Sequence, residues 1–419
     1  MLVSKSAAAE TPAEWAKQNL DELVTLYRHF HSHPELSFHE QETARRFAQE
    51  LKQAGFDVTT QVGGTGVVAL LKNGPGQTLM LRTDLDALPV AEQTGLAYAS
   101  QVTVKNDSGV EVGVMHACGH DVHITNLIAV GRFMASHRDQ WKGTLMLIGQ
   151  PAEERGAGAK AMLEDGLFEK FPKPDFAIAL HVSSDMAAGN VGVRAGYSLA
   201  NVDSVDITVH GKGGHGAAPD TTVDPIVQAA QLILALQTIV SREVKPIEPA
   251  VVTVGSIHGG TKHNIIGNDC HLQLTVRSYT DEVRSQILDA IRRKAKGVAI
   301  AAGAPEPTIE VSEGTPALFN SEELAGRIGK HFESLLGKDH VEQVEPSMGG
   351  EDFSRYGRAG VPILMYRLGA VDAKRLDRYK ELGQTPPSLH SPLFYPDIEP
   401  ALTTGITTMA SAALNLLQP

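Results

Sequence analysis

The stretch that decides the fold is residues 58–82, VTTQVGGTGVVALLKNGPGQTLMLR. It contains three short strand-like runs, Val58–Val62, Val67–Leu71 and Leu79–Arg82, with Gly-rich and Pro-containing turn signals between them. Apolar runs of this length, bounded by Gly and Pro, predict β-strands rather than helices. The chain therefore begins its sheet early, and further strands are expected after this stretch.

Helical periodicity flanks these strands. Apolar residues at helical spacing predict helices over 15–30 and 40–54 before the strands, and a further helix over 124–136 after them. Leu145–Ile148 and Ala177–Leu180 are two more strand-like runs. Strands that alternate with helices predict an α/β fold with a mainly parallel sheet and helices on both faces. In such sheets, functional side chains gather at the C-terminal ends of the strands.

The middle of the chain has a different order of elements. It contains a strand, a Gly-rich loop, a long helix, two strands and a second long helix, over residues 202–209, 211–216, 223–240, 250–257, 270–278 and 282–302. This order predicts a small α+β unit with an antiparallel sheet. The alternating pattern resumes near Thr315 and runs to a final helix over 398–417. We expect a larger domain formed by residues 1–194 and 312–419, and a smaller domain, 195–311, inserted into it.

Composition excludes several classes of protein. A chain of 419 residues is too long for one small core. Its 42% hydrophobic and 21% charged residues are ordinary for a folded protein, and its net charge of −12 argues against a nucleic-acid partner. Two cysteines, Cys118 and Cys270, are too few for a disulfide framework, although the sequence allows a single disulfide bond between them.

We expect no membrane span, because no apolar run is long enough to cross a bilayer. The N-terminal stretch MLVSKSAAAETPAEW lacks the apolar core of an intact signal peptide, although it could be the remnant of one. The expected compartment is the cytoplasm, with the periplasm as the alternative.

Five segments concentrate side chains that bind metals: Arg82–Pro89, Met115–His123, Gln150–Gly156, Leu180–Val182 and Leu389–Ser391. Taken singly, a histidine at a strand end is usually structural, a pair of aspartates usually forms a turn, and a pair of glutamates usually faces solvent. Met115–His123 differs, since three His, one Cys and one Asp lie within eight residues before an apolar helix. Thiolate, imidazole and carboxylate groups together are the ligands of zinc and its neighbours.

The adjacent pair Glu153-Glu154 offers a division of labour. One carboxylate can bind metal while the other acts as a general base towards water acidified by the metal. Other hydrolytic chemistries fit less well, because the chain has no G-x-S-x-G elbow at a strand–helix turn and no G-x-x-x-x-G-K-[ST] loop. Cys118 could be a nucleophile instead, but His120 is too close in sequence to serve easily as its base.

The sequence resembles the metal-dependent amidohydrolases and exopeptidases that include hippurate hydrolase, aminoacylases, auxin–amino acid conjugate hydrolases and carboxypeptidase G. It looks most like the hippurate and auxin-conjugate branch. The matching stretches span nearly the whole chain in the family's order: His31–Ser37, Arg82–Pro89, Met115–His123, Gly149–Gly156, Gly211–Pro219, Asn264–Ile266, Gly349–Phe353 and Leu389–Pro392.

The resemblance implies roles for particular residues. Two divalent ions would be held by five ligands: Cys118, His120, Glu154, His181 and His390. Glu153 would be the general base, and Asp86 would lie behind the site and orient a ligand or the base. Most branches have His-x-Asp where this chain has Asp84-x-Asp86, and Cys118 is the compensating change. Whether Asp84 contacts metal therefore stays open.

The inserted domain resembles the family's lid and dimerisation domain. There, His215 would stabilise the tetrahedral oxyanion, and Asn264 and Arg277 would hold the carboxylate of the substrate. The resemblance also implies a homodimer that forms through this domain.

We expect an enzyme that cleaves the amide bond of N-acyl-L-amino acids, with two metal ions activating water and Glu153 as general base. A dipeptidase or carboxypeptidase is the alternative within the enzyme class, and a catalytically silent ligand-binding relative is the alternative outside it. Zn or Mn is the expected metal, and Co or Ni would also suit a mixed ligand set.

Overall fold

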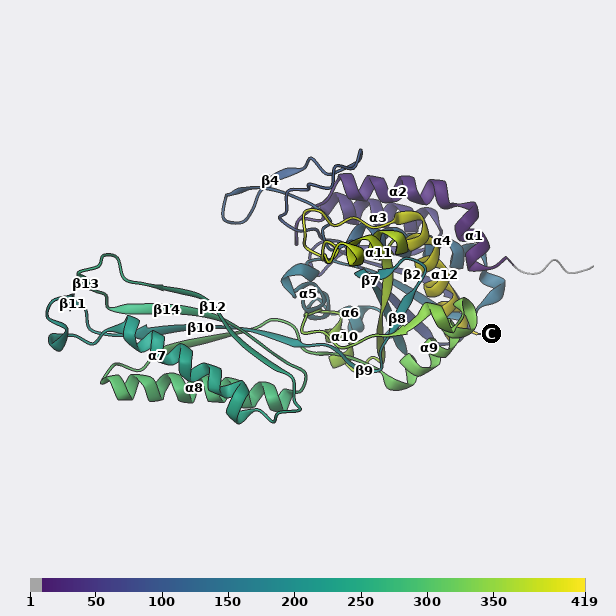
Figure 1. Cartoon of the computed structure of the whole chain (residues 1–419). Helices are drawn as coiled ribbons and strands as arrows, with labels where there is room; N and C mark the ends of the chain where they lie inside the picture. Colours follow the sequence, from purple (N-terminus) through teal and green to yellow (C-terminus); the bar gives the residue numbers. More distant parts are fainter. Residues whose placement is uncertain (1–9, 419) are drawn as a thin grey trace, which may run out of the picture. The chain divides into compact units, whose positions relative to one another are not determined.

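The computed structural model describes residues 10–418, apart from the side chain of Glu313. Residues 1–9, the start of the stretch considered above as a signal remnant, lie outside the described residues. The chain divides into two compact units (Figure 1). The first unit comprises Met1–Gly196, Phe319–Glu345 and Arg355–Pro419, and the second comprises Tyr197–Leu318 and Pro346–Ser354.

An eight-stranded sheet forms the centre of the first unit, in the order β1-β2-β6-β3-β7-β18-β8-β17. Its strands are β1 (Asp57–Val62), β2 (Gly66–Asn73), β3 (Thr78–Asp84), β6 (Gly143–Gln150), β7 (Phe176–Ala187), β8 (Val191–Val193), β17 (Val341–Gln343) and β18 (Ile363–Val371). The central strands β6, β3, β7 and β18 are parallel to one another, as the sequence predicts. A mostly parallel central sheet of mixed type is therefore confirmed.

The margins of this sheet are antiparallel. The pairs β1–β2, β2–β6 and β18–β8 run in opposite directions, while β17 runs parallel to β8. The first of these pairs follows from the sequence, because β1 and β2 are joined by the short Gly-rich turn at residues 63–65, which can connect only antiparallel neighbours.

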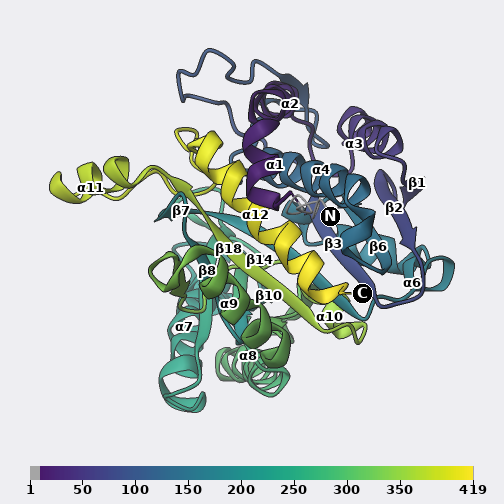
Figure 2. The same cartoon turned by 90° about the vertical axis from the view of Figure 1, so that its right-hand side faces the viewer.

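Helices cover both faces of the sheet. The larger layer contains α1 (Pro12–Gln18), α2 (Leu20–Ser32), α3 (Gln41–Gln53), α4 (His120–Ser136), α9 (Glu322–Leu336) and α12 (Ile398–Leu416). Figure 2 shows α12 lying across the strands. On the other face lie the short helices α5 (Gly158–Glu164), α6 (Leu167–Lys170) and α10 (Ser354–Arg358). Tyr356 of α10 joins them, because its hydroxyl contacts Gln150 at 3.1 Å and Met162 at 3.7 Å.

The helix expected over 15–30 is two helices, because Asn19 ends α1 and begins α2. Its side-chain amide donates to the carbonyl of Trp15 at 2.8 Å, and its backbone N–H donates to the same carbonyl at 3.1 Å, so one residue closes the end of α1. The capping box of Thr11 and Glu14 fixes the start of α1. This unit also contains the hairpin β4 (Thr103–Lys105) and β5 (Glu111–Gly113) and the helix α11 (Ala373–Glu381).

The second unit is an antiparallel four-stranded sheet in the order β12-β14-β10-β15, with two long helices. The strands are β10 (Asn201–His210), β12 (Ala250–Gly259), β14 (Asp269–Ser278) and β15 (Thr308–Glu313), and the helices are α7 (Pro225–Thr238) and α8 (Asp281–Ala302). Buried and accessible residues alternate along β10 and β14. The helices pack on the apolar face and on each other, and they close a core separate from that of the first unit.

Pro346–Ser354 groups with the second unit, although we expected it in the larger domain. Backbone hydrogen bonds explain the difference: the Ser347 N–H donates to the Ser198 carbonyl and the Ala200 N–H to the Gly349 carbonyl, both at 2.9 Å. Cys118 and Cys270 are both free thiols. Within residues 10–418, no helix has the length and apolarity needed to span a bilayer.

Candidate metal centre

Three neighbouring strands deliver the first functional side chains to one edge of the sheet. The strands β6 and β7 flank β3 in parallel, and Asp84 at the end of β3 pairs in register with Gln150 at the end of β6. The chain then continues into Asp86 after β3 and into Glu153 and Glu154 after β6, while His181 lies within β7. Parallel strands place these groups together because their carboxyl ends share one edge.

The other two contributions come from loops. Cys118 precedes α4, and His120 is the first residue of that helix. His390 lies on a loop whose backbone is tied to the Cys118 segment, because the His390 N–H donates to the Ala117 carbonyl at 2.9 Å. His390 has a φ of 69°. A residue other than glycine adopts this conformation only where its surroundings hold it.

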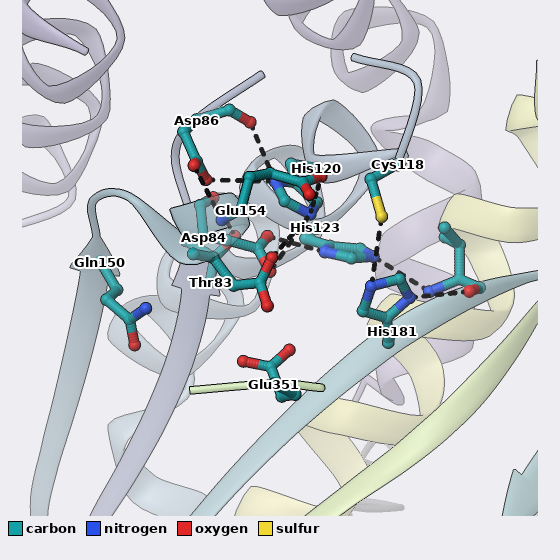
Figure 3. Close-up of polar contacts among 12 residues, drawn as sticks. Thr83, Asp84, Asp86, Cys118, His120, His123, Gln150, Glu154, His181 and Glu351 are labelled. Atoms are coloured by element: carbon teal, nitrogen blue, oxygen red, sulfur yellow. Dashed lines mark hydrogen bonds and ion pairs between the residues drawn. The ribbon is translucent and has the colours of Figure 1, made fainter. Parts of the chain in front are cut away.

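The structure brings all five expected ligands together. Figure 3 shows four of them: Cys118, His120, Glu154 and His181. Two groups of ligand atoms, each within 4.8 Å of one another, share the thiol: Cys118, His120 and His181, and Cys118, Glu154 and His390. The Cys118 Sγ lies 3.6 Å from His181 Nε2, and the Glu154 oxygens lie 3.5 Å from His390 Nε2 and 3.8 Å from His120 Nε2.

Hydrogen bonds to the backbone orient two of the imidazoles. The Nδ1–H of His120 donates to the Asp86 carbonyl at 2.9 Å, and the Nδ1–H of His181 donates to the Val182 carbonyl at 2.8 Å. Each ring therefore turns Nε2 towards the centre, where it can bind a cation in its deprotonated form. A hydrogen bond from the other ring nitrogen to a backbone carbonyl is typical of histidines that bind metals.

Unpaired atoms test whether a cation fits these residues. Among the residues that the structure describes, His120 Nε2 and Glu154 Oε1 are buried and have no hydrogen-bond partner. Burying such groups without a partner is costly. Because they face a thiol and a second carboxylate, Glu153, at 3.9 Å from His120 Nε2, a divalent cation would satisfy them all.

The ionisation of the centre agrees with this fit. Burial raises the pKa of the Glu154 carboxyl to about 7, and burial together with nearby Glu154 raises the pKa of the Cys118 thiol well above its usual range. Burial, reinforced by neighbouring His123, holds the pKa of His181 low, so this ring is neutral. A bound cation would stabilise the charged thiolate and carboxylate and so lower both pKa values, since ligands bind metal in their deprotonated forms.

Asp84, whose role the sequence left open, has both oxygens engaged by the protein. Its Oδ2 accepts from the Arg82 guanidinium at 2.8 Å, and its Oδ1 accepts from His123 Nδ1 at 2.7 Å. The other nitrogen of His123 accepts the Val182 N–H at 3.0 Å. This geometry favours a supporting role for Asp84 and His123, which brace β3 against β7 behind the ligands.

Asp86 contacts two of the expected ligands. Besides its carbonyl bond to His120, its Oδ2 accepts the Glu154 N–H at 3.1 Å and the Ser37 hydroxyl at 2.6 Å. Glu40 fixes the segment after β6 that carries Glu154, because its carboxylate accepts the Ala152 N–H at 2.8 Å. Sequence reasoning gave Ser37 and Glu40 no role, although Ser37 ends one of the matching stretches, because nothing local shows which backbone a side chain will meet.

The expected substrate-binding residues lie in the second unit. The two-stranded ribbon of β11 (Gly214–His215) and β13 (Ile265–Ile266) brings His215 beside Asn264, whose carbonyl accepts the Gly216 N–H at 2.9 Å. His215 Nδ1 accepts the Ala217 N–H at 3.0 Å, which leaves Nε2–H as a donor in the neutral ring. Arg277 lies elsewhere on the sheet and donates to the Met348 carbonyl at 2.8 Å.

Comparison with known proteins agrees with this arrangement. Residues 80–381 match peptidase family M20/M25/M40. The chain is 36% identical to thermostable carboxypeptidase 2 of Saccharolobus solfataricus, over 86% of this chain and 88% of that protein. It is 39% identical to hippurate hydrolase of Campylobacter jejuni, over 79% and 84% of the two chains.

A solved structure has the same fold. The crystal structure of the Bacillus subtilis YXEP protein, described as a dinuclear metal-binding peptidase, superposes with a TM-score of 0.77 at 30% identity. The match covers 96% of this chain and 99% of that one.

Proposed function

The chain belongs to peptidase family M20/M25/M40, and we propose that it is a metal-dependent amidohydrolase that cleaves N-acyl-L-amino acids into a carboxylic acid and a free amino acid. The observation that carries this proposal is the buried convergence of Cys118, His120, Glu154 and His181 with His390, beside a carboxylate, Glu153, that is not needed as a ligand. Hippurate hydrolase is among the relatives of similar length.

The residues of the chain divide the chemistry between them. Divalent ions held by the five ligands would polarise the amide carbonyl and acidify water. Glu153 would take the proton from the attacking water and deliver it to the nitrogen of the leaving amine, so that the amide C–N bond breaks and a C–O bond forms. Asp86 would keep His120 and the Glu154 backbone in place through its three hydrogen bonds.

A carboxypeptidase or dipeptidase is the second candidate. Thermostable carboxypeptidase 2 supports it, since that relative is as similar to the chain as hippurate hydrolase is. Both reactions break an amide bond beside a free carboxylate, so one centre serves either. For the metal, we propose Zn or Mn, with Co or Ni as alternatives, because occupancy follows availability as well as affinity.

A hydrolysis screen tests these proposals directly. N-acetyl, N-benzoyl and long-chain acyl amino acids would be assayed beside dipeptides, with metal analysis of the same sample. We expect the acyl amino acids to be the best substrates and two ions to be bound per chain. The matched control is Glu153→Gln, which should keep its metal and lose about 10²–10⁴-fold in kcat. Full activity of that variant would remove Glu153 from its role.

We also propose that the second unit mediates a homodimer. Its strand β12 is an edge of the sheet, and several large apolar side chains of this unit are exposed, among them Val227 (54%), Leu234 (72%) and Ile247 (75%). Exposed apolar groups beside an open strand edge are typical of a surface that another chain covers. Light scattering should give twice the mass of the chain, and Leu234→Glu should shift the protein to monomer. A monomeric wild-type protein would contradict the proposal.

A further inference from the structure

A buried histidine outside the metal centre joins two of the segments that carry its ligands. His31, near the end of α2, is 1% exposed. Its Nδ1 lies 2.7 Å from Asp121 Oδ2, and its Nε2 lies 3.1 Å from Glu92 Oε1. The three side chains are at most 1% exposed. The ring therefore connects two carboxylates from distant parts of the chain, away from solvent.

His31 is doubly protonated in this arrangement. A carboxylate only accepts hydrogen bonds, so each ring nitrogen must donate. Burial opposes the charge, but the hydrogen bonds that the ring donates to Asp121 and Glu92 outweigh it and raise the pKa of His31 to about 9. A buried ionic triad is weak evidence of stability, because apolar residues of similar size often stabilise a fold as well or better. The triad therefore calls for a reason beyond packing.

The first carboxylate belongs to the segment that carries Cys118 and His120. Asp121 is the second residue of α4, directly after His120, and its other oxygen accepts the Val122 N–H at 2.9 Å. Its side chain is thus fixed to the helix on one side and to His31 on the other. His31 is consequently tied to the first turn of α4.

The second carboxylate belongs to a loop that supports His390. Glu92 also accepts the Ser100 N–H at 2.6 Å, which shapes residues 92–100. The next residue, Gln93, donates its backbone N–H to the Pro392 carbonyl at 2.8 Å, two residues after His390. The His390 side chain is 55% exposed, far more than the Glu154 side chain it faces at 9%. It therefore depends on such backbone ties for its position.

We propose that His31 is a positioning residue that sets the spacing between the two ligand-bearing segments, Cys118–His120 and the His390 loop. It touches no substrate and binds no metal, and it acts through Asp121 on one side and through Glu92 and Gln93 on the other. This role rests on the proposed metal centre. His31 supports that centre from α2, an element that carries none of the five expected ligands.

Cobalt binding tests the proposal without relying on hydrolysis. Apo protein would be titrated with Co²⁺, and the thiolate-to-cobalt and d–d absorption bands would report on geometry at Cys118 and its neighbours. We expect His31→Gln to weaken binding of at least one ion by about 10–100-fold, the usual effect of losing a group that orients ligands, and to change the spectrum. Glu92→Ala leaves the His31–Asp121 contact in place and should weaken binding in the same direction.

The matched control is His331→Gln. His331 is a half-buried histidine of the same unit that bonds Ser411 at 2.7 Å between α9 and α12. It should alter stability at most and leave the cobalt spectrum unchanged. If His31→Gln does not fold, Glu92→Ala decides the question alone. Wild-type affinity and spectrum in a folded His31→Gln or Glu92→Ala protein would overturn the positioning role, whereas a wild-type protein that takes up no cobalt would overturn the proposed function as well.

Discussion

Gly119, between two expected ligands, offers a sharp test of how the centre is built. It caps α4 with a φ of 75°, and a Cβ placed there would lie 2.6 Å from Val182 Cγ2. Gly119→Ala therefore combines two costs: about 1–2 kcal/mol for a left-handed residue with a side chain, and about 1–3 kcal/mol for overpacking. We expect the free energy of unfolding to fall by about 2–5 kcal/mol in total.

The assay can be confined to the unit that contains the site. Both tryptophans, Trp15 and Trp141, lie in the first unit, so their fluorescence during urea unfolding of apo protein reports on it alone. Gly55→Ala is the control, because Gly55 has a φ of 92° and nothing within 4 Å of an added Cβ. The free energy of unfolding of Gly55→Ala should fall only by the cost of the left-handed backbone conformation, about 1–2 kcal/mol.

The two variants separate backbone strain from steric conflict. Gly119→Ala should also bind metal more weakly, since relief of the contact with Val182 must move the backbone between Cys118 and His120. Equal losses of stability in the Gly119 and Gly55 variants would show that the close contact with Val182 is absent. Unchanged metal affinity in Gly119→Ala would show that the ligands do not depend on this backbone.

Two further predictions concern individual side chains. Cys118→Ser should lower metal affinity more than stability, and in the wild type the Cys118 thiol should resist alkylation until a chelator is added; equal labelling rates with and without chelator would exclude it as a ligand. His215→Ala should keep its metal but lose about 10²–10³-fold in kcat, the effect of one missing oxyanion donor, and full activity would remove it from the mechanism. If His215 serves the partner chain, mixing His215→Ala with Glu153→Gln should restore part of the activity once subunit exchange is demonstrated, and no rescue after proven exchange would refute that version.

Local sequence patterns predicted the strands of the fold better than they predicted which strands pair with each other. The runs at 67–71, 79–82, 145–148 and 177–180 all lie within observed strands, because an apolar run bounded by turns is a local property. The strand β18 is central to the sheet, yet it was not predicted, since its pairing with β7 joins residues far apart in the sequence. Pairing between strands so far apart in the sequence depends on how the whole core assembles.

The same limit applies to the candidate centre. Residue types and spacing singled out the five segments rich in thiol, imidazole and carboxylate groups, and the family resemblance then implied which residues in them are the ligands and that Glu153 is the base. The supports did not stand out: the hydroxyl of Ser37 meets Asp86, and His31 meets Glu92, only after the chain has folded. Such contacts follow from where helices dock on the sheet, which no short motif encodes.

The order of strands in the central sheet has a consequence for synthesis on the ribosome. The outer edge of β7 is completed only by β18, and 175 residues separate Ala187 at the end of β7 from Ile363 at the start of β18. At roughly 5–20 residues per second, the nascent chain carries this open edge for about 9–35 s. During that time its unpaired N–H and C=O groups can pair with another chain. Slower translation lengthens this interval, so chaperone supply, rather than the stability of the finished protein, should govern the yield of folded enzyme.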